Sequence, residues 1–498
     1  MSRPTLTENQ RRAVLNQATR SYVEAAPGSG KTTIAVERHG VLHHRRTSCD
    51  PRGILSVTYT RSAASELRQR ISERWGSHAL SPLNRVMTID GLHRSVVEFL
   101  LTTGKVRWPG GVTSLSPIDS WARQRGATLL MPSTKRDKRW EFKLRERALS
   151  ATYRRVNLPC WGMHYSKRQH WMEQIENGIC SHDEIRQVVS LSLSDIELRN
   201  EIAQYLTRTY QHLIVDEVFD ANPLDALLIR TCLEVDIDTT LVGDPWQALY
   251  QWRGANPKLI HTLLTKYNFH SYPTPESFRF RTPETTQLSE RLRAGHPVKL
   301  PISADRPDVV LAGEWSHLTA CGADVIPLSF GRLDCQTDAA LILLLDVVTR
   351  ARLRLSALGI HEATRCLRRD LGEVDLSAAT AALHDLRNPL EECMRKLRFA
   401  TKVDNRIPAL PRDRQKAQTR FRRLELLRRW LTIECSYSPG LTFHQAKGRE
   451  WPSVDLALTR ASISSLASGL TPEKEAHRKL YVGATRGIYS TRLRNLDD

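Results

Sequence analysis

Strand-like and helix-like runs alternate through the first part of the chain. "SYVEA" (21–25) precedes a glycine-rich turn. The β-branched run "GILSVTYT" (53–60) is followed by "SAASELRQRISERW" (62–75), in which apolar residues recur with helical spacing. The same alternation returns at "HLIVDE" (212–217) and "TTLVGD" (239–244). Strands that alternate with helices predict a parallel sheet covered by helices, and therefore an α/β fold.

The pattern changes in two internal stretches. Residues 102–198 and 341–431 are basic and mainly helical in their apolar spacing, and the first is also rich in Trp. "SYPTPE" (271–276) is typical of a linker, and strand-like runs resume beyond it, as in "DVVLAGE" (308–314). We expect two α/β cores, each interrupted by a mainly helical insertion. The expected boundaries are 1–101, 102–198 and 199–272 for the first core, and 273–340, 341–431 and 432–498 for the second.

Composition narrows the class of protein. The chain has 498 residues, a formal net charge of +19 and a pI near 9.8. A polyanion such as nucleic acid is the simplest partner for that charge, with a generally basic soluble surface as the alternative. Nine cysteines are spread singly without a zinc-binding spacing, which favours reduced thiols and a cytoplasmic location. The N-terminus has no apolar signal-peptide core, and the apolar run "AALILLLDVV" (339–348) is too short for a bilayer, so we expect no membrane partner.

The strongest chemical signal is "AAPGSGKTT" (25–33), which lies between a strand and a helical stretch. This is the setting of a P-loop, in which Gly28 and Gly30 let backbone N–H groups point at phosphate oxygens. Lys31 would reach the β- and γ-phosphates, and Thr32 would bind Mg²⁺. Ala25 stands where the strict motif has its first Gly. The alternative is a glycine-rich turn that ends in Lys-Thr by chance. The predicted nucleotide cradle comprises Ala26, Gly28, Ser29, Gly30, Lys31, Thr32 and Thr33.

Two further strand ends carry candidate chemistry. In "LIVDEVFDANP" (213–223), Asp216 would hold the metal and Glu217 would act as the general base on water. The alternative is a strand that merely stops at solvent, which the P-loop on the same core disfavours. In "TLVGDPWQALYQWRGANP" (240–257), Gln247 could sense a γ-phosphate. The aromatic residues beside Gln247 suit stacking on unpaired bases, with a core aromatic cluster as the alternative.

In this order, the motifs resemble those of superfamily 1A DNA helicases of the UvrD/Rep type, over almost the whole chain. The matching stretches are "LTENQRRAV", "AAPGSGKTT", "VTYTRSAASELRQRI", "MTIDGLH", "VDEVFD", "VGDPWQALYQWRGA", "SFRFRTPE", "LTFHQAKGREW" and "KLYVGATRG". The resemblance implies two RecA-like P-loop NTPase domains with Mg²⁺ and ATP bound in the cleft between them. It further implies 3′→5′ movement on single-stranded or tailed duplex DNA.

The resemblance also assigns roles to individual residues. Gln10 would read the adenine edge, Phe278 would stack on the base, and Glu450 would sit near the ribose. Arg279 and Arg486 would be the two arginine fingers, which join Lys31, Asp216, Glu217 and Gln247 as the catalytic group. The residues expected to contact DNA are Thr58, Tyr59, Thr60, Thr88, Gly91, His93, Tyr250, Trp252, Arg253, His444 and Lys447.

This chain departs from the family pattern at Phe219, where the family has Gln; the departure would loosen coupling between hydrolysis and DNA contact. The insertions are short, which puts processivity in doubt. Trp121, Trp140, Trp161 and Trp171 would grip duplex DNA or lie under a solvated basic face, and the basic stretch 412–429 has the same two interpretations. The main hypothesis is an ATP-driven helicase or translocase. The second is a DNA-triggered ATPase subunit beside a partner nuclease, since the helicase subunit of Gabija anti-phage systems is similar in size and plan. A DNA-binding scaffold with an inactive ATP site is the third.

Overall fold

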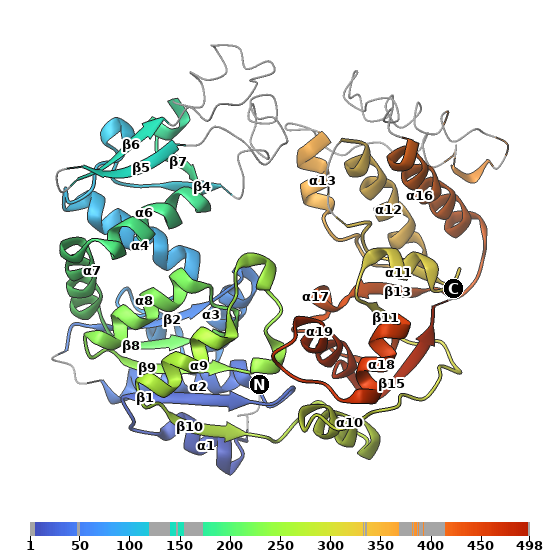
Figure 1. The fold of residues 1–498 in the computed structure, drawn as a ribbon, viewed down its shortest axis with the longest axis horizontal. Helices are drawn as coiled ribbons and strands as arrows, with labels where there is room; N and C mark the ends of the chain where they lie inside the picture. The colour runs from blue at the N-terminus through green and yellow to red at the C-terminus, as the bar shows by residue number, and fades with distance from the viewer. Residues whose placement is uncertain are drawn as a thin grey trace. The chain divides into compact units, whose positions relative to one another are not determined.

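The computed structural model describes most of the chain, which divides into two compact units, Met1–Phe278 and Arg279–Asp498. Each unit contains a parallel sheet with helices, so the expected α/β fold is confirmed (Figure 1). The described residues are 5–46, 50–118, 140–145, 148–153, 173–331, 333, 336–367, 381, 383–385, 387, 392 and 414–496.

The first unit is built on a six-stranded parallel sheet. Its strands, in spatial order, are β10 (His270–Thr274), β1 (Arg20–Ala25), β9 (Asp238–Gly243), β8 (Tyr210–Val215), β2 (Gly53–Thr58) and β3 (Arg85–Thr88). All strands run the same way, so their carboxyl ends meet at one edge. The order β1-β9-β8 therefore brings together the segments that carry the P-loop, Gln247 and the two acids.

Helices cover both faces of this sheet because successive strand residues point to opposite sides. Ile54 and Ile214 pack with α2 and α3, whereas Leu55 and Leu213 belong to the larger core that includes α4 and α6 to α8. The helices are α1 (Glu8–Leu15), α2 (Lys31–Arg45), α3 (Arg61–Trp75), α4 (Ile89–Thr102), α6 (His182–Ser194), α7 (Ile196–Thr209), α8 (Pro223–Glu234) and α9 (Pro257–Lys266). The short 3-10 helices are η1 (Ser77–Leu80), η2 (Pro109–Gly111), η5 (Val218–Asp220), η6 (Pro245–Gln247) and η7 (Gln251–Arg253).

Two segments of this unit differ from the sequence prediction. The expected linker 271–276 contributes to strand β10, which pairs with β1 at the sheet edge, where Pro273 is tolerated. The stretch 102–198 contains strands besides its helices, and Figure 1 shows them beyond α4 and α6, away from the main sheet. These strands are β4 (Ser116–Ile118) paired with β7 (Ile179–Ser181), and β5 (Trp140–Arg145) paired with β6 (Ala148–Tyr153). Trp121, Trp161 and Trp171 lie outside the described residues.

The second unit is built on a five-stranded parallel sheet. Its strands, in spatial order, are β12 (Val325–Pro327), β13 (Ser438–Thr442), β11 (Val309–Ala312), β14 (Trp451–Leu458) and β15 (Gly487–Asn495). The helices are α10 (Pro283–Arg293), α11 (Trp315–Ala320), α12 (Gln336–Leu353), α13 (Ile360–Leu367), α16 (Arg414–Thr432), α17 (Phe443–Ala446), α18 (Arg460–Ser468) and α19 (Glu475–Ala484). The apolar run 339–348 lies inside α12, where most of it is buried in a core shared with α13 and α16. Within the described residues, no helix combines the length and apolar character needed to cross a membrane.

Candidate active site

The P-loop of the first unit has the backbone that phosphate binding requires. Strand β1 ends at Ala25 and α2 begins at Lys31. Between them Gly28 and Gly30 have φ angles of 74° and 79°, in the left-handed region that glycine adopts without steric cost. Helix α2 starts without a side-chain cap, so its first N–H groups and its positive dipole end suit an anion. Ala25 is fully buried in the core beside Val23, so the Cβ that departs from the strict motif is accommodated.

Two segments on either side of the P-loop hold it in place. Gln10, which is buried, donates through Nε2 to the Ser29 carbonyl at 2.8 Å and accepts from the Thr7 backbone N–H at 3.0 Å. Ser277 Oγ donates to the Pro27 carbonyl at 2.7 Å, and the Phe278 N–H donates to the Gly28 carbonyl at 2.9 Å. Sequence reasoning missed Ser277, and it expected only base contacts from Gln10.

Two acids follow β8, and the second of them faces the P-loop lysine. Asp216 is buried, and its Oδ1 accepts the backbone N–H of Glu217 at 2.9 Å. Glu217 has a φ of 57°, which is uncommon for a residue with a side chain and recurs at functional sites. Its Oε1 lies 4.0 Å from Lys31 Nζ. The fold therefore brings the predicted lysine, metal ligand and base together at one edge of the sheet.

Gln247 follows the neighbouring strand β9, and its side chain is held by a residue to which the sequence alone gave no role. Asp244 follows β9, is fully buried, and accepts Gln247 Nε2 at 2.7 Å through Oδ2. Its other oxygen accepts the Trp246 N–H at 3.1 Å. A carboxylate directly after a strand was the signal in the sequence. Asp244 fixes the direction of the Gln247 side chain at the carboxyl end of β9.

Phe219 is a core residue of the same region. It is 2% exposed, and its ring lies edge-on to Tyr22 with centroids 6.0 Å apart. The centroid of the His261 ring lies 5.0 Å from that of Phe219. A Cβ added at Gly243 would come within 3.0 Å of Phe219 Cδ2, so β9 approaches the ring closely. The side chain that departs from the family pattern therefore fills space between β1, β9 and α9.

These residues fit Mg²⁺ and a nucleoside triphosphate. The glycine cradle and the uncapped helix α2 suit phosphate oxygens, and Lys31 adds a positive charge beside them. Thr32 in the first turn of α2 and the buried Asp216 offer the oxygen donors that Mg²⁺ takes in addition to phosphate oxygens and water. Ala26, Ser29 and Thr33 lie in the same loop and first helical turn.

Several residues expected to contact DNA occupy capping or core positions. Thr60 and Thr88 cap α3 and α4, accepting the N–H groups of Ala63 and Gly91 at 3.1 Å each. Thr58 is buried and pairs in register with Thr88 across β2 and β3. The segments that follow these two strands therefore lie at the same sheet edge. The side chains of Tyr59 and His93 are also buried. Their burial leaves little side-chain surface for direct contact with a DNA strand.

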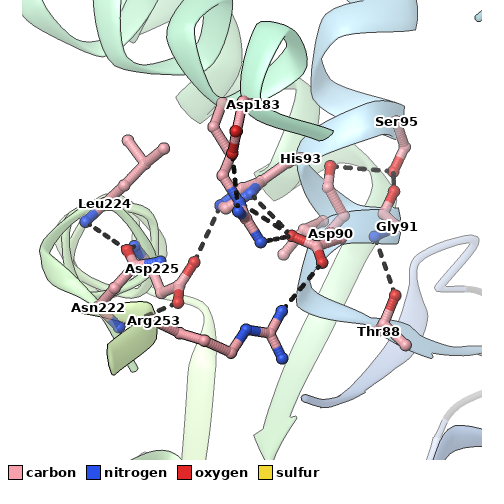
Figure 2. A network of polar contacts seen from close by, with 12 residues as sticks. Thr88, Asp90, Gly91, His93, Ser95, Asp183, Asn222, Leu224, Asp225 and Arg253 are labelled. Atoms are coloured by element: carbon pink, nitrogen blue, oxygen red, sulfur yellow. Dashed lines mark hydrogen bonds and ion pairs between the residues drawn. The ribbon is translucent and has the colours of Figure 1, made fainter. Parts of the chain in front are cut away.

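His93 belongs to a buried polar network that crosses four elements (Figure 2). Its Nε2 lies 3.3 Å from Asp225 Oδ1 on α8, and its Nδ1 lies 4.0 Å from Asp90 Oδ1 on its own helix. Arg186 of α6 and Arg253 of η7 also approach Asp90. Burial lowers the pKa of His93 to about 4 and raises the pKa of Asp225 to about 6. Tyr250 immediately precedes η7 and is half-buried, and nothing is described of the Trp252 side chain.

The second unit gathers candidate residues from three distant stretches. Arg279 donates through Nε to Glu450 Oε2 at 2.8 Å and through Nη1 to the Thr485 carbonyl at 2.7 Å. Arg486, which follows Thr485 in the chain, is buried and donates through Nε to the Val482 carbonyl at 2.8 Å. The fold therefore places Arg279, Glu450 and Arg486 in one cluster. His444 lies on α17 and Lys447 directly follows that helix, both half-buried.

Comparisons with known proteins agree with this arrangement. Residues 6–107 and 172–268 match the family described as the UvrD/REP helicase N-terminal domain. A probable DNA helicase II homolog of Mycoplasma capricolum is 27% identical over 277 residues, covering 53% of this chain and 37% of that protein. DNA helicase II of Escherichia coli is 25% identical over 284 residues, covering 55% and 38%. ATP-dependent DNA helicase PcrA of Staphylococcus aureus is 23% identical over 271 residues, covering 51% of this chain and 36% of that protein.

The chain matches less than half of the length of each of these relatives. The matched residues nevertheless include the P-loop, both acids after β8, and Gln247. They also include the four elements of the buried network. Residues 6–107 and 172–268 therefore belong to the UvrD/REP helicase N-terminal domain family, which supports a superfamily 1A helicase of the UvrD/Rep type.

Proposed function

We propose that the chain is an ATP-dependent DNA helicase or translocase that moves on single-stranded DNA in the 3′→5′ direction. The observation that carries the proposal is the group formed by Lys31, Asp216 and Glu217 around a glycine cradle, with Lys31 Nζ 4.0 Å from Glu217 Oε1. This group lies within the part of the chain that matches the helicase family. The resemblance of the motifs supports the direction of movement.

The residues of the first unit divide the work of hydrolysis. Bound Mg²⁺-ATP supplies the phosphoryl group that is cleaved. The backbone of the P-loop and Lys31 orient its phosphates, and Thr32 and Asp216 hold the ion. Glu217 orients a water molecule and accepts its proton at the carboxylate, since this side chain comes from the same strand end as the metal ligand. Gln247, whose Nε2 donates to Asp244 Oδ2, is proposed to sense the γ-phosphate.

The second unit is proposed to contribute positive charge to the transition state. Arg279 and Arg486 lie in one cluster with Glu450, and guanidinium groups of this kind stabilise the charge that spreads over the transferred phosphoryl oxygens. DNA contacts are proposed for both units. In the first, the N-termini of α3 and α4 at Thr60 and Thr88 suit phosphate groups, and Tyr250 suits base stacking.

Strand separation on tailed duplexes tests this function. The full chain is mixed with ATP, Mg²⁺ and a duplex that carries a 3′ tail, a 5′ tail or no tail. We expect strands to separate only on the 3′-tailed duplex, with the variant Lys31→Ala as the inactive control. Unwinding of the 5′-tailed duplex would contradict the proposed direction. ATP hydrolysis without separation of any duplex would favour instead a DNA-triggered ATPase that acts on a partner such as a nuclease.

A further inference from the structure

Asp90 is shared between two arginines that come from different parts of the first unit. It lies in the first turn of α4, next to Gly91. Its Oδ1 accepts Arg186 Nη2 at 2.6 Å and Nε at 3.1 Å, and its Oδ2 lies 3.6 Å from Arg253 Nη2 (Figure 2). The Asp90 side chain is 14% exposed, whereas those of Arg186 and Arg253 are 27% and 31% exposed. One carboxylate thus faces two guanidinium groups that both keep access to solvent.

The two pairings differ in strength. The contacts with Arg186 are short charge-assisted hydrogen bonds, and the Arg253 distance is too long for a hydrogen bond. Asp90 is ionised at neutral pH: burial raises its pKa, but the attraction and hydrogen bonds of Arg186 outweigh burial, so the net shift is downward. His93 lies 4.0 Å from Asp90, but it is neutral there because burial lowers its pKa to about 4. Arg186 is therefore the main neutralising group for Asp90.

Arg253 is the cation of this group that stands beside the expected base-stacking residues. It is the last residue of η7, which begins directly after Tyr250. The segment that bears it is tied to the loop after β8 by the Asn256 N–H, which donates to the Ala221 carbonyl at 2.9 Å. A guanidinium at this place suits a DNA phosphate, whose oxygens offer the same acceptor geometry as a carboxylate. Asp90 and a phosphate would therefore compete for one group.

We infer that Asp90 holds Arg253 as an intramolecular substitute for a DNA phosphate, and that Arg186 sets how strongly Asp90 holds it. The inference rests on the proposed function, because it needs a single strand beside Arg253. With Arg186 in place, much of the Asp90 charge is neutralised and Arg253 is released to phosphate at low cost. Without Arg186, Asp90 retains Arg253 more tightly and DNA binding weakens.

A purely structural role for the network makes a different prediction. If Asp90 only joins α4 to α6, then Asp90→Asn and Arg186→Gln both loosen the unit, and neither variant improves DNA binding. Competition between Asp90 and phosphate instead predicts effects of opposite sign. Asp90→Asn should tighten binding and Arg186→Gln should weaken it. A gain in affinity cannot arise from poor folding, so the sign separates the two roles.

The test measures the affinity of the full chain for a fluorescent oligo-dT by anisotropy, without nucleotide and at several NaCl concentrations. We expect Asp90→Asn to lower Kd about fivefold and Arg186→Gln to raise it about fivefold, the size of a partly exposed ion pair. Arg253→Gln should weaken binding, reduce the salt dependence by about 0.7 in log–log slope, and abolish the gain from Asp90→Asn in the double variant. Asp183→Asn is the matched loss of a negative charge, since Asp183 also contacts Arg186, at 3.4 Å, and is largely exposed. Arg94→Gln is the matched loss of a positive charge on α4.

The outcomes separate this inference from the proposed function. If the unaltered chain binds no single-stranded DNA, the proposed function fails and this inference fails with it. If it binds and Asp90→Asn has the affinity of the unaltered chain or a weaker one, this inference alone is overturned. A gain that Asp183→Asn reproduces, or that persists with Arg253→Gln, also overturns it. Arg186→Lys, which keeps the charge, should bind DNA nearly as the unaltered chain does and provides a second test if Asp90→Asn does not fold.

Discussion

The two units prepare their charged chemistry in different ways. In the first, the backbone does most of the positioning: Gly28 and Gly30 take left-handed conformations, helix α2 starts uncapped, and Glu217 follows its strand with a φ of 57°. In the second, side chains are held by internal acceptors. Arg279 is bound to Glu450 and to the Thr485 carbonyl, and Arg486 is bound to the Val482 carbonyl.

This difference suggests a division of labour. A preformed backbone cradle binds an anion at little reorganisation cost, so nucleotide affinity should depend on the first unit. Arginines that already have acceptors must lose part of those contacts to bind an anion. The loss is offset only where the negative charge on the anion is largest, which is in the transition state. The second unit should therefore affect the rate of hydrolysis more than the affinity for nucleotide.

The largest expected effect comes from the second unit. Arg279→Ala should lower kcat by about 10³- to 10⁵-fold, as removal of an arginine finger does, and should change nucleotide affinity far less. Single-turnover hydrolysis and binding of a fluorescent ATP analogue measure the two quantities separately. Arg291→Ala, on the exposed side of α10, is the matched control and should leave both unchanged. An equal loss of affinity and rate in Arg279→Ala would break the proposed division.

The next effect concerns the base of the first unit. Glu217→Gln should lower kcat by about 10²- to 10⁴-fold, because the amide cannot accept the water proton. Nucleotide and DNA binding should persist, since the P-loop backbone is untouched. Glu66→Gln on the exposed face of α3 serves as the control. Near-normal hydrolysis by Glu217→Gln would place the base elsewhere.

Phe219 tests how far the packing of the first unit matters. Phe219→Gln would bury an amide among Tyr22, His261 and β9, at a cost of about 1–3 kcal/mol in the free energy of unfolding. We expect basal hydrolysis per folded molecule to remain nearly unchanged and DNA stimulation to change. Denaturant unfolding and ATPase assays measure these quantities, and Phe219→Leu keeps the apolar character. A collapse of basal hydrolysis in a folded Phe219→Gln protein would show that the ring shapes the hydrolytic group itself.

A substitution at Gln10 should have a smaller effect, on the affinity of the P-loop for ATP. Gln10→Ala removes the donor to the Ser29 carbonyl and leaves a buried acceptor without that partner, a loss of about 1 kcal/mol. We expect KM for ATP to rise about fivefold with little change in kcat. Steady-state kinetics decides, with Gln69→Ala on the exposed face of α3 as the control. A fall in kcat at constant KM would contradict a role in affinity.

A further effect is a pH dependence of stability, which we expect to be larger in the first unit than in the second. Burial lowers the pKa values of His39, His93 and His212 to about 4, below the ordinary value of 6.5. The unfolded chain binds these protons first, so stability falls as pH drops from 6.5 towards 4, by at most about 1.4 kcal/mol per pH unit for each group. Asp225, whose pKa burial raises to about 6, acts in the opposite direction below that pH and offsets part of the loss.

We expect the first unit to unfold at lower denaturant concentration than the second when the pH falls from 7 to 5. Hydrogen exchange of peptides from each unit measures this order. His93→Gln should reduce the dependence of the first unit's stability on pH, provided the variant is folded at pH 7. A shift that is equal in both units would contradict the assignment to these three histidines.

Local motifs were predictable from the sequence, and tertiary environments were not. The P-loop was recognisable because Gly28, Gly30 and Lys31 are neighbours, and the acids because Asp216 ends an apolar strand. The burial of Tyr59 and His93 was not foreseeable, because it depends on helices far along the chain. Strand β10 was missed because prolines suggested a linker, although an edge strand tolerates Pro273.

The strands of 102–198 were missed for a different reason. In "WEFKLR" (140–145) apolar residues alternate with charged ones, which is the period of a strand, but the many basic residues around it suggested helices. Asp244 and Ser277 could be given no role from the sequence. Their importance lies in which side chain or carbonyl they reach, and only the fold shows those partners.

We propose that the hydrolytic group of the first unit belongs to a motor driven along DNA. Steady-state ATP hydrolysis by the full chain, with and without saturating single-stranded DNA, tests it most directly. We expect a marked rise in kcat with DNA, and no hydrolysis in either condition for Lys31→Ala. Equal rates with and without DNA in the unaltered chain would contradict it.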